Sequence, residues 1–386
     1  MKRRDFIKLT SLSILPIFNN NKLYNLISNT TLNKNNYLIL IELKGGNDGI
    51  NTVIPYNDNS YYNLRPDISI NRDKILKISE ELGFNPNMES IYELWKTKEL
   101  AIICGVGYPN PNRSHFRSIE IWETASNSQT VLDDGWIAQA FKKYKERKKI
   151  DGLVLGGSDF GSLIGKNMKN LIIENTEQFI KEARKVKKVP IKTNNEALKH
   201  ILQVENQIYD SYEILEEYLD YVPEIKTSFP QSNLGNQSLT AFKIISSKVP
   251  VSVIKLELTG FDTHINQLNN HGKLLKDLSD SILALKKALS EVNMWNNTTI
   301  MTYSEFGRRA YQNGNNGTDH GTASVHFITG GQIKGGVYGK YPSLDDLLQG
   351  DLKYNIDYRS LYSTISKKLW NISPDFLVKY PTLDIF

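Results

Sequence analysis

Short apolar runs alternate with longer amphipathic segments over most of this 386-residue chain. The apolar runs are rich in β-branched residues and leucine, and runs of about four to eight such residues are typical of buried strands. We expect strands at residues 37–43, 100–104, 152–155, 251–258, 298–303 and 325–329. Helical patterns lie between them, at residues 88–98, 114–124, 136–147, 195–222, 237–247, 267–293 and 357–369. This alternation predicts an α/β fold, a three-layer αβα sandwich around a mostly parallel central sheet.

The composition is that of a soluble globular protein, with 40% hydrophobic and 23% charged residues. Residues 37–386 are predicted to form one domain, with a helical cap or insertion around residues 158–230. Cys104 is the only cysteine, which excludes an intramolecular disulfide. The net charge of +5 is spread along the chain, and its lysine-rich runs alternate with apolar or acidic residues. We interpret these runs as solvated helix faces and predict no nucleic-acid partner.

The chain begins with a pattern typical of protein export. Arg3 and Arg4 are followed by Phe6, Ile7 and Lys8, and then by an apolar stretch at residues 9–18 that is too short to span a bilayer. The pattern resembles the twin-arginine export signal, which implies a periplasmic or extracellular protein. No Ala-x-Ala cleavage site follows in the asparagine-rich residues 19–36, so a membrane tether through an uncleaved signal stays open. We assign residues 1–36 to the signal and a polar linker.

Residues capable of chemistry cluster around the ends of the predicted strands. In an open parallel sheet, ligands bind at the carboxyl ends of the strands, because loops diverge and helix N-termini point inward there. Carboxylates and imidazoles are the mixed oxygen and nitrogen ligands that suit zinc or manganese. We therefore expect these residues to converge on one site for a divalent metal. The residues are Asp48, Arg113, Ser114, His115, Asp262, His264, Glu305 and His320.

Each of these residues also has a purely structural interpretation. Asp48 lies among glycines, where an Asx turn explains it as well as a metal ligand does. Ser114 precedes a helical pattern and could serve as an N-cap, although a helix N-terminus also stabilises a reactive alkoxide. Asp262 and His264 could form a local hydrogen bond, and Glu305 could pair with a nearby arginine. The residue types alone leave these alternatives open.

Several motifs, taken in order, resemble a bacterial family known as domain of unknown function family 1501. The matching segments are the twin-arginine start and residues 43–55, 105–118, 134–136, 260–264, 303–308, 317–322 and 358–360. The resemblance extends over residues 37–369.

This family is similar to the alkaline phosphatase and sulfatase superfamily, and the resemblance implies the αβα sandwich and a set of roles. It implies Asp48 as the early metal ligand, Ser114 as the nucleophile, Asp262 with His264 on one metal, and His320 as the last ligand. Two departures stand out. The imidazole expected at position 266 stands at 264, and Glu305-Phe306 replaces an Asp-His pair. Glu305 alone remains as a ligand there, or His115 or His320 substitutes.

Two hypotheses follow. The first is an exported metal-dependent hydrolase of small anionic phosphate or sulfate esters. In it, zinc or manganese is held by Asp48, Asp262, His264, Glu305 and His320, and catalysis involves Ser114, Arg113 and His115. The second is a non-catalytic exported envelope protein, or a partner of another exported protein, on the same scaffold. Phe306 at a ligand position favours the second hypothesis.

Overall fold

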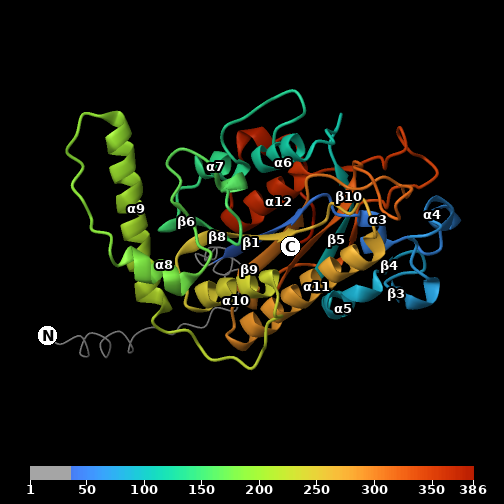
Figure 1. The fold of residues 1–386 in the computed structure, drawn as a ribbon, viewed down its shortest axis with the longest axis horizontal. Coiled ribbons are helices and arrows are strands. Elements are labelled where there is room, and N and C mark those ends of the chain that lie inside the picture. The colour runs from blue at the N-terminus through green and yellow to red at the C-terminus, as the bar shows by residue number, and fades with distance from the viewer. Residues whose placement is uncertain (1–35) are drawn as a thin grey trace, which may run out of the picture. The chain divides into compact units, whose positions relative to one another are not determined.

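A nine-stranded sheet forms the centre of the computed structural model, which describes residues 36–386 (Figure 1). The predicted export signal lies outside the described residues. The strand order is β11-β5-β10-β9-β1-β8-β6-β7, and β12 also pairs with β5. The strands are β1 (Tyr37–Lys44), β5 (Leu100–Gly107), β6 (Ile150–Leu155), β7 (Asn170–Ile172), β8 (Val251–Thr259), β9 (Thr298–Tyr303), β10 (Ser324–Gly330), β11 (Gly336–Tyr338) and β12 (Ile356–Asp357).

The central strands are parallel and almost completely buried, as their continuous apolar sequences predict. β1 lies between β8 and β9 and runs parallel to both, with Ile41 paired with Leu256 and Thr302. Only β10, among the described strands of this sheet, runs antiparallel to its neighbours, β5 and β9. The expected mostly parallel sheet is confirmed.

Helices cover both faces of this sheet, and successive side chains of β1 point to opposite faces. Ile39 and Ile41 pack in one apolar core together with α5, α10 and α11, whereas Leu38 and Leu40 pack in a second core with α6, α7 and α12. This arrangement confirms the three-layer αβα sandwich. The helices are α3 (Gly49–Thr52), α4 (Asn59–Leu64), α5 (Glu89–Lys96), α6 (His115–Thr124), α7 (Trp136–Phe141), α8 (Thr176–Ala183), α9 (Glu196–Leu219), α10 (Asn233–Ser246), α11 (Gln267–Glu291) and α12 (Arg359–Trp370).

Some elements differ from the sequence-based expectation. α7 ends at Phe141 instead of continuing to residue 147, because the next residues are mostly charged and offer little apolar surface to the core. The stretch around residues 158–230 contains β7, which joins the main sheet beside β6, as well as α8 and α9. A separate small sheet is formed by β2 (Val53–Ile54), β4 (Gly83–Phe84) and β3 (Leu76–Lys77). No helix within residues 36–386 has the length and apolar character needed to cross a bilayer.

Candidate metal centre

A single buried arginine ties together the loops that follow the central strands. Arg308, only 1% exposed, lies just beyond β9. Its guanidinium donates hydrogen bonds to the carbonyl oxygens of Gly45, Gly46, Phe261 and Thr318. Gly45 and Gly46 have positive φ angles of 119° and 83°, and a Cβ at Gly45 would lie 2.4 Å from the Asp262 nitrogen. The loops after β1, β8 and β9 therefore approach one another closely at the carboxyl ends of the strands.

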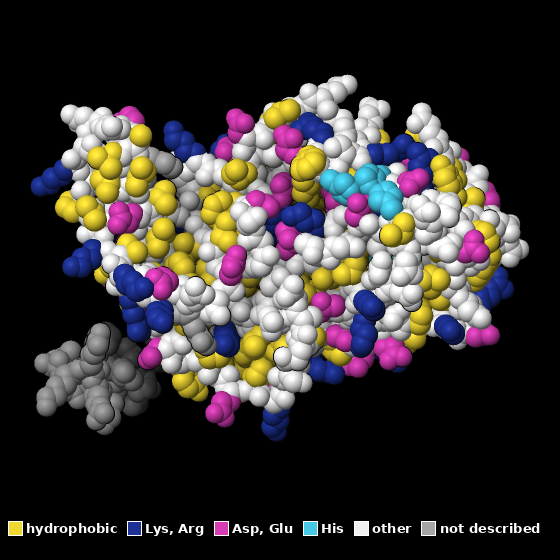
Figure 2. Space-filling model, in the orientation of Figure 1, with side chains coloured by type: hydrophobic (Ala, Val, Ile, Leu, Met, Phe, Trp, Pro, Cys, Tyr) yellow, Lys and Arg dark blue, Asp and Glu magenta, His cyan; other side chains and the backbone are white. Residues whose placement is uncertain are grey.

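Three imidazoles face one carboxylate at this edge of the sheet. The Nε2 atoms of His264 and His320 lie 3.0 Å and 3.2 Å from Asp262 Oδ1, and His115 Nε2 lies 3.4 Å from Asp262 Oδ2. Ligand atoms of His115, Asp262 and His320 all lie within 4.8 Å of one another. Histidine side chains form a patch on the surface seen in Figure 2. The structure thus brings four of the sequence-predicted residues together.

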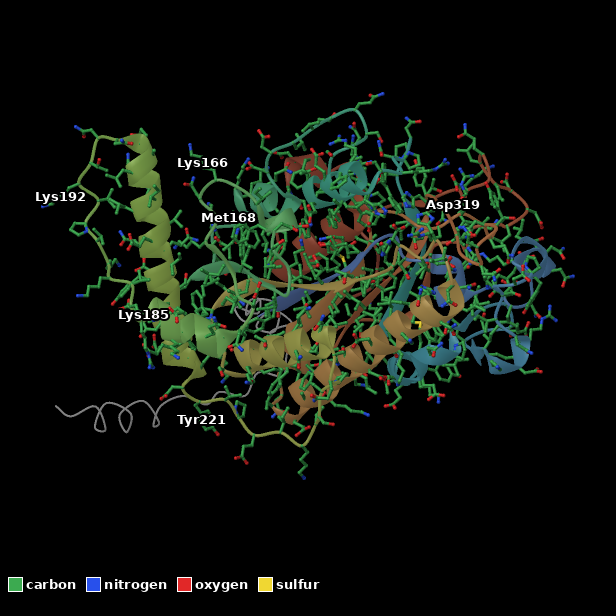
Figure 3. All side chains as sticks on the ribbon, in the orientation of Figure 1. Lys166, Met168, Lys185, Lys192, Tyr221 and Asp319 are labelled. Atoms are coloured by element: carbon green, nitrogen blue, oxygen red, sulfur yellow. The ribbon has the colours of Figure 1, made fainter. Side chains whose placement is uncertain are left out.

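The opposite ring nitrogen of each histidine contacts an acceptor. His115 Nδ1 lies 2.8 Å from Glu305 Oε1, His264 Nδ1 lies 3.2 Å from Asp319 Oδ1, and His320 Nδ1 lies 2.8 Å from the Arg113 carbonyl oxygen. Figure 3 labels Asp319. A carboxylate or carbonyl oxygen accepts a hydrogen bond from Nδ1–H, and in the neutral ring this tautomer leaves the Nε2 lone pair free. This arrangement, with Nδ1 bound to an acceptor and Nε2 free, is that of most metal-binding histidines.

The Nε2 atoms of the three histidines do not face a hydrogen-bond donor when each Nδ1 carries the ring proton. His264 Nε2 and His320 Nε2 lie 3.0 Å apart, and both face the acceptor Asp262 Oδ1. His115 Nε2 is buried and makes no hydrogen bond. If each Nδ1–H is donated to its acceptor, neutral imidazoles direct three Nε2 lone pairs toward one another and the carboxylate, an arrangement that a bound cation or a second ring proton stabilises. The donor set therefore fits a divalent metal ion.

The local charges shift the pKa values of these groups in different directions. The hydrogen bond to Glu305 raises the pKa of His115 and outweighs the effect of burial. Burial lowers the pKa of His320, with a further contribution from the positive charge of Arg308. Burial alone would raise the pKa of Asp262, but the hydrogen bond and charge of Arg308 bring it below its ordinary value. These shifts favour the carboxylate form of Asp262 and the neutral form of His320.

Asp48 is not part of this group. Its carboxylate is fully buried and forms a bidentate ion pair with Arg65, with distances of 2.6 Å and 3.0 Å. It also accepts hydrogen bonds from Gln267 Nε2 and from the Ile50 backbone nitrogen, which it caps at the start of α3. These partners occupy both oxygens, so the structure gives Asp48 a structural role in place of the expected metal contact. The sequence carries no signal that would pair Asp48 with Arg65.

Glu305 and Phe306 orient the imidazoles. Glu305 is 2% exposed, and its Oε1 accepts hydrogen bonds from the Gly45 backbone nitrogen and from His115. The Phe306 ring stacks on His320, with ring centroids 4.7 Å apart, and lies 4.9 Å from the His115 ring. Glu305 therefore contacts a histidine that faces the site, and the Phe306 ring packs against two of them.

Ser114 and Arg113 lie beside the group, on the loop that precedes α6. Ser114 takes the N-cap position of α6, but its hydroxyl makes no capping bond and its side chain is exposed. The Arg113 guanidinium pairs with Asp351, while its backbone carbonyl supports His320. The remaining described histidine side chains lie elsewhere: burial lowers the pKa of His271 to about 4 and that of His326 to about 3.

Comparison with solved structures finds similar chains among hydrolases and related proteins. A sulfatase from Pseudoalteromonas sp., PsFucS1, matches with a TM-score of 0.44 and 10% identity over 94% of this chain and 73% of that one. The phosphonate monoester hydrolase of Agrobacterium radiobacter matches with a TM-score of 0.41 and 7% identity over 86% and 73%. A protein in the alkaline phosphatase superfamily from Vibrio parahaemolyticus matches with a TM-score of 0.40 and 12% identity over 84% and 69%.

The sequence comparisons are more specific. A search of curated proteins finds no match. A family model described as "Protein of unknown function (DUF1501)" matches residues 95–380, which include α6, β8, β9 and every residue of the imidazole group. The resemblance expected from the motifs is confirmed, and the chain belongs to the DUF1501 family.

Proposed function

We propose that this protein is a metal-dependent hydrolase of phosphate or sulfate esters that acts outside the cytoplasm. The observation that carries the proposal is the orientation of the three imidazoles, each with Nε2 toward Asp262 and Nδ1 on an acceptor. A structural hydrogen-bond network would instead alternate donors and acceptors, so that each polar atom faces an atom of the opposite kind. The export step rests on the sequence pattern at residues 3–8.

His115, Asp262 and His320 would hold the ion, with His264 beside them. Three protein ligands that leave a position open are typical of catalytic zinc, whereas four protein ligands are typical of structural zinc. His264 is the most exposed of the three imidazoles, with 40% of its side chain accessible, and in this proposal it stays outside the set of three ligands. When bound, a divalent cation here would act as a Lewis acid on a phosphoryl or sulfuryl oxygen.

Ser114 is the proposed nucleophile. It directly precedes His115, its side chain is exposed, and its hydroxyl is free of the capping bond. Its position at the N-terminus of a ten-residue helix stabilises a developing alkoxide and favours an anionic substrate. Arg113 does not serve the anion in this proposal, since its guanidinium is already paired with Asp351.

Metal content of the purified full chain tests the proposal. After loading with zinc or manganese and dialysis, we expect one ion per chain in the wild type and none in Asp262→Asn combined with His320→Gln. Asp375→Asn is a matched control, because its carboxylate is 85% exposed on a different segment. Ser114→Ala should keep the ion and lose hydrolysis of 4-nitrophenyl phosphate and 4-nitrophenyl sulfate. A folded wild type that takes up no ion contradicts the proposal.

A non-catalytic exported protein on the same scaffold is the second candidate. The observation that favours it is the 2.6 Å contact between Arg308 Nη2 and Asp262 Oδ1, since a buried guanidinium already neutralises the central carboxylate. Under this hypothesis the wild type and the Ser114→Ala variant behave identically in every hydrolysis assay, and the partner is another exported protein.

A further inference from the structure

A cavity of about 530 Å³ lies beside the metal-ligand group. This volume falls within the range of roughly 300–1,000 Å³ that is usual for small-molecule sites. Asn110, Pro111 and Arg113 form one part of its wall, which ends two residues before His115. Thr322 and Ala323 form another part, which begins two residues after His320. Arg113 belongs to both places, because its side chain lines the cavity and its carbonyl oxygen accepts the hydrogen bond from His320 Nδ1.

The wall is held together by specific hydrogen bonds. The Tyr108 hydroxyl accepts a bond from the Asn112 backbone nitrogen at 3.1 Å, which fixes the loop before α6. Thr322 Oγ1 donates to the Leu352 carbonyl at 2.6 Å, which joins the loop after His320 to the segment at residues 348–354. The cavity is therefore built from the same loops that position the imidazoles.

The lining of the cavity is largely apolar and aromatic. Tyr108 and Leu352 are buried, whereas Leu348 and Tyr354 are 61% and 40% exposed. Large apolar side chains that stay accessible around a cavity favour the binding of an apolar group, because binding removes their surface from water. The apolar and aromatic lining residues are Tyr108, Pro111, Ala323, Leu348, Leu352 and Tyr354.

Both cations of the lining are already paired. The Arg113 guanidinium forms an ion pair with Asp351, whose side chain is 1% exposed, and Lys353 pairs with Asp346. The other polar lining residues, Asn110, Thr322 and Gln349, are uncharged. A ligand group with its own negative charge would compete with these carboxylates for the two cations. An uncharged apolar group faces no such competition.

We infer that this cavity receives the alcohol part of the ester, and that this part is an uncharged aromatic or similarly flat apolar group. The inference rests on the proposed function, since it assumes that the anionic end of the ligand binds at the imidazole group. It assigns the substrate class as esters of apolar aryl-type alcohols, as opposed to esters that carry a second anion.

The test compares two non-hydrolysable anions, methylphosphonate and phenylphosphonate, by calorimetric titration of the zinc-loaded full chain. We expect phenylphosphonate to bind about tenfold more tightly, which corresponds to about 1.4 kcal/mol. Leu348→Gln combined with Tyr354→Ser should abolish this gain and leave methylphosphonate binding unchanged, which also shows that the variant is folded. Val378→Asn, a substitution at a 70% exposed position outside the cavity lining, should change neither affinity.

Each other outcome overturns the inference in a distinguishable way. Equal affinities of the wild type for the two phosphonates would exclude the apolar subsite and leave the metal-dependent function standing. A phenyl gain that survives in the double variant would place the ring elsewhere. Tighter binding of 4-carboxyphenylphosphonate than of phenylphosphonate would show that the ligand is anionic. If neither anion binds the zinc-loaded chain, the proposed function itself fails.

Discussion

The Asp48→Asn variant tests whether the Asp48 carboxylate stabilises the fold or binds a metal ion. In the wild type Asp48 and Arg65 are both fully buried, and the five N–H groups of Arg65 are directed to Asp48, Asn51 and the carbonyl oxygens of Arg309 and Ala310. Breaking a buried ion pair costs about 3–5 kcal/mol, because it leaves an uncompensated charge. Asparagine keeps one oxygen for Arg65 and is itself a good N-cap. We therefore expect the unfolding free energy to fall by about 3 kcal/mol, near the lower end of the range for a broken buried ion pair.

Urea denaturation at neutral pH measures this loss, and metal analysis of the same samples measures occupancy. Asp58→Asn is the matched control: Asp58 caps α4 through a 2.8 Å bond to the Ser60 nitrogen but is not buried, so its replacement should cost less than about 0.5 kcal/mol. We expect Asp48→Asn to be less stable than the wild type and to bind the same amount of metal. A variant of unchanged stability that no longer binds metal would refute this reasoning and restore Asp48 as a ligand.

The same pair predicts a pH dependence. Burial acts to raise the pKa of Asp48, but Arg65 overcomes this effect and the pKa is lowered in the folded protein. A carboxyl whose folded pKa is depressed stabilises the fold above its unfolded value of about 3.9 and loses this contribution as the pH falls through the folded pKa. The stability difference between the wild type and Asp48→Asn should therefore shrink only in strongly acidic solution. A difference that already disappears at about pH 5 would contradict the pairing.

Three further predictions follow from individual contacts. Gly46→Ala should cost about 1–3 kcal/mol, because its φ is positive and a Cβ would lie 2.4 Å from the Phe306 ring, whereas Gly314→Ala, with no atom near its Cβ, should be neutral in the same urea titration. Burial raises the pKa of Glu123 to about 7, so the stability of the wild type falls as the pH rises toward that value. Glu123→Gln cannot ionise, and its stability relative to the wild type should therefore increase between about pH 5 and pH 8. A stability difference that does not change with pH would show that the pKa of Glu123 is not raised. Glu305→Gln should weaken zinc binding roughly 10- to 100-fold through His115, and unchanged affinity would show that Glu305 does not orient the ring.

The main sheet was predictable from the sequence because its strands are buried on both faces. Continuous apolar runs such as residues 37–43 and 251–258 have few alternatives to a central parallel strand. Strands β7 and β11, of three residues each, and the two-residue strands of the small sheet carry too few positions for a pattern to emerge. The end of α7 at Phe141 shows the same limit, since charged residues are compatible with a helix but do not enforce one.

The sequence predicted where in the sheet the site lies, but only some of the residues that form it. Because carboxyl ends of parallel strands meet at one edge, the convergence of Asp262, His264 and His320 follows from topology. What the sequence could not specify is which polar group contacts which. Asp48 and Glu305 are both carboxylates at strand ends, yet one is held by Arg65 and the other by His115. Such partners are decided by distances of a few ångströms between segments far apart in sequence.

Charge balance explains why we propose one metal ion in place of a pair. The carboxylates of Asp262, Glu305 and Asp319 contact the imidazoles, and the guanidinium of Arg308 contacts Asp262. These four groups carry a net charge of minus two when the histidines are neutral, and the charge of Arg309 also acts on Asp319. One divalent cation neutralises this charge, whereas a second would bring a net positive charge against a buried arginine, and unpaired buried charge is strongly unfavourable. Asp48, the carboxylate that could have supplied another ligand, already neutralises Arg65. The charge of the site thus matches a single divalent ion better than a pair.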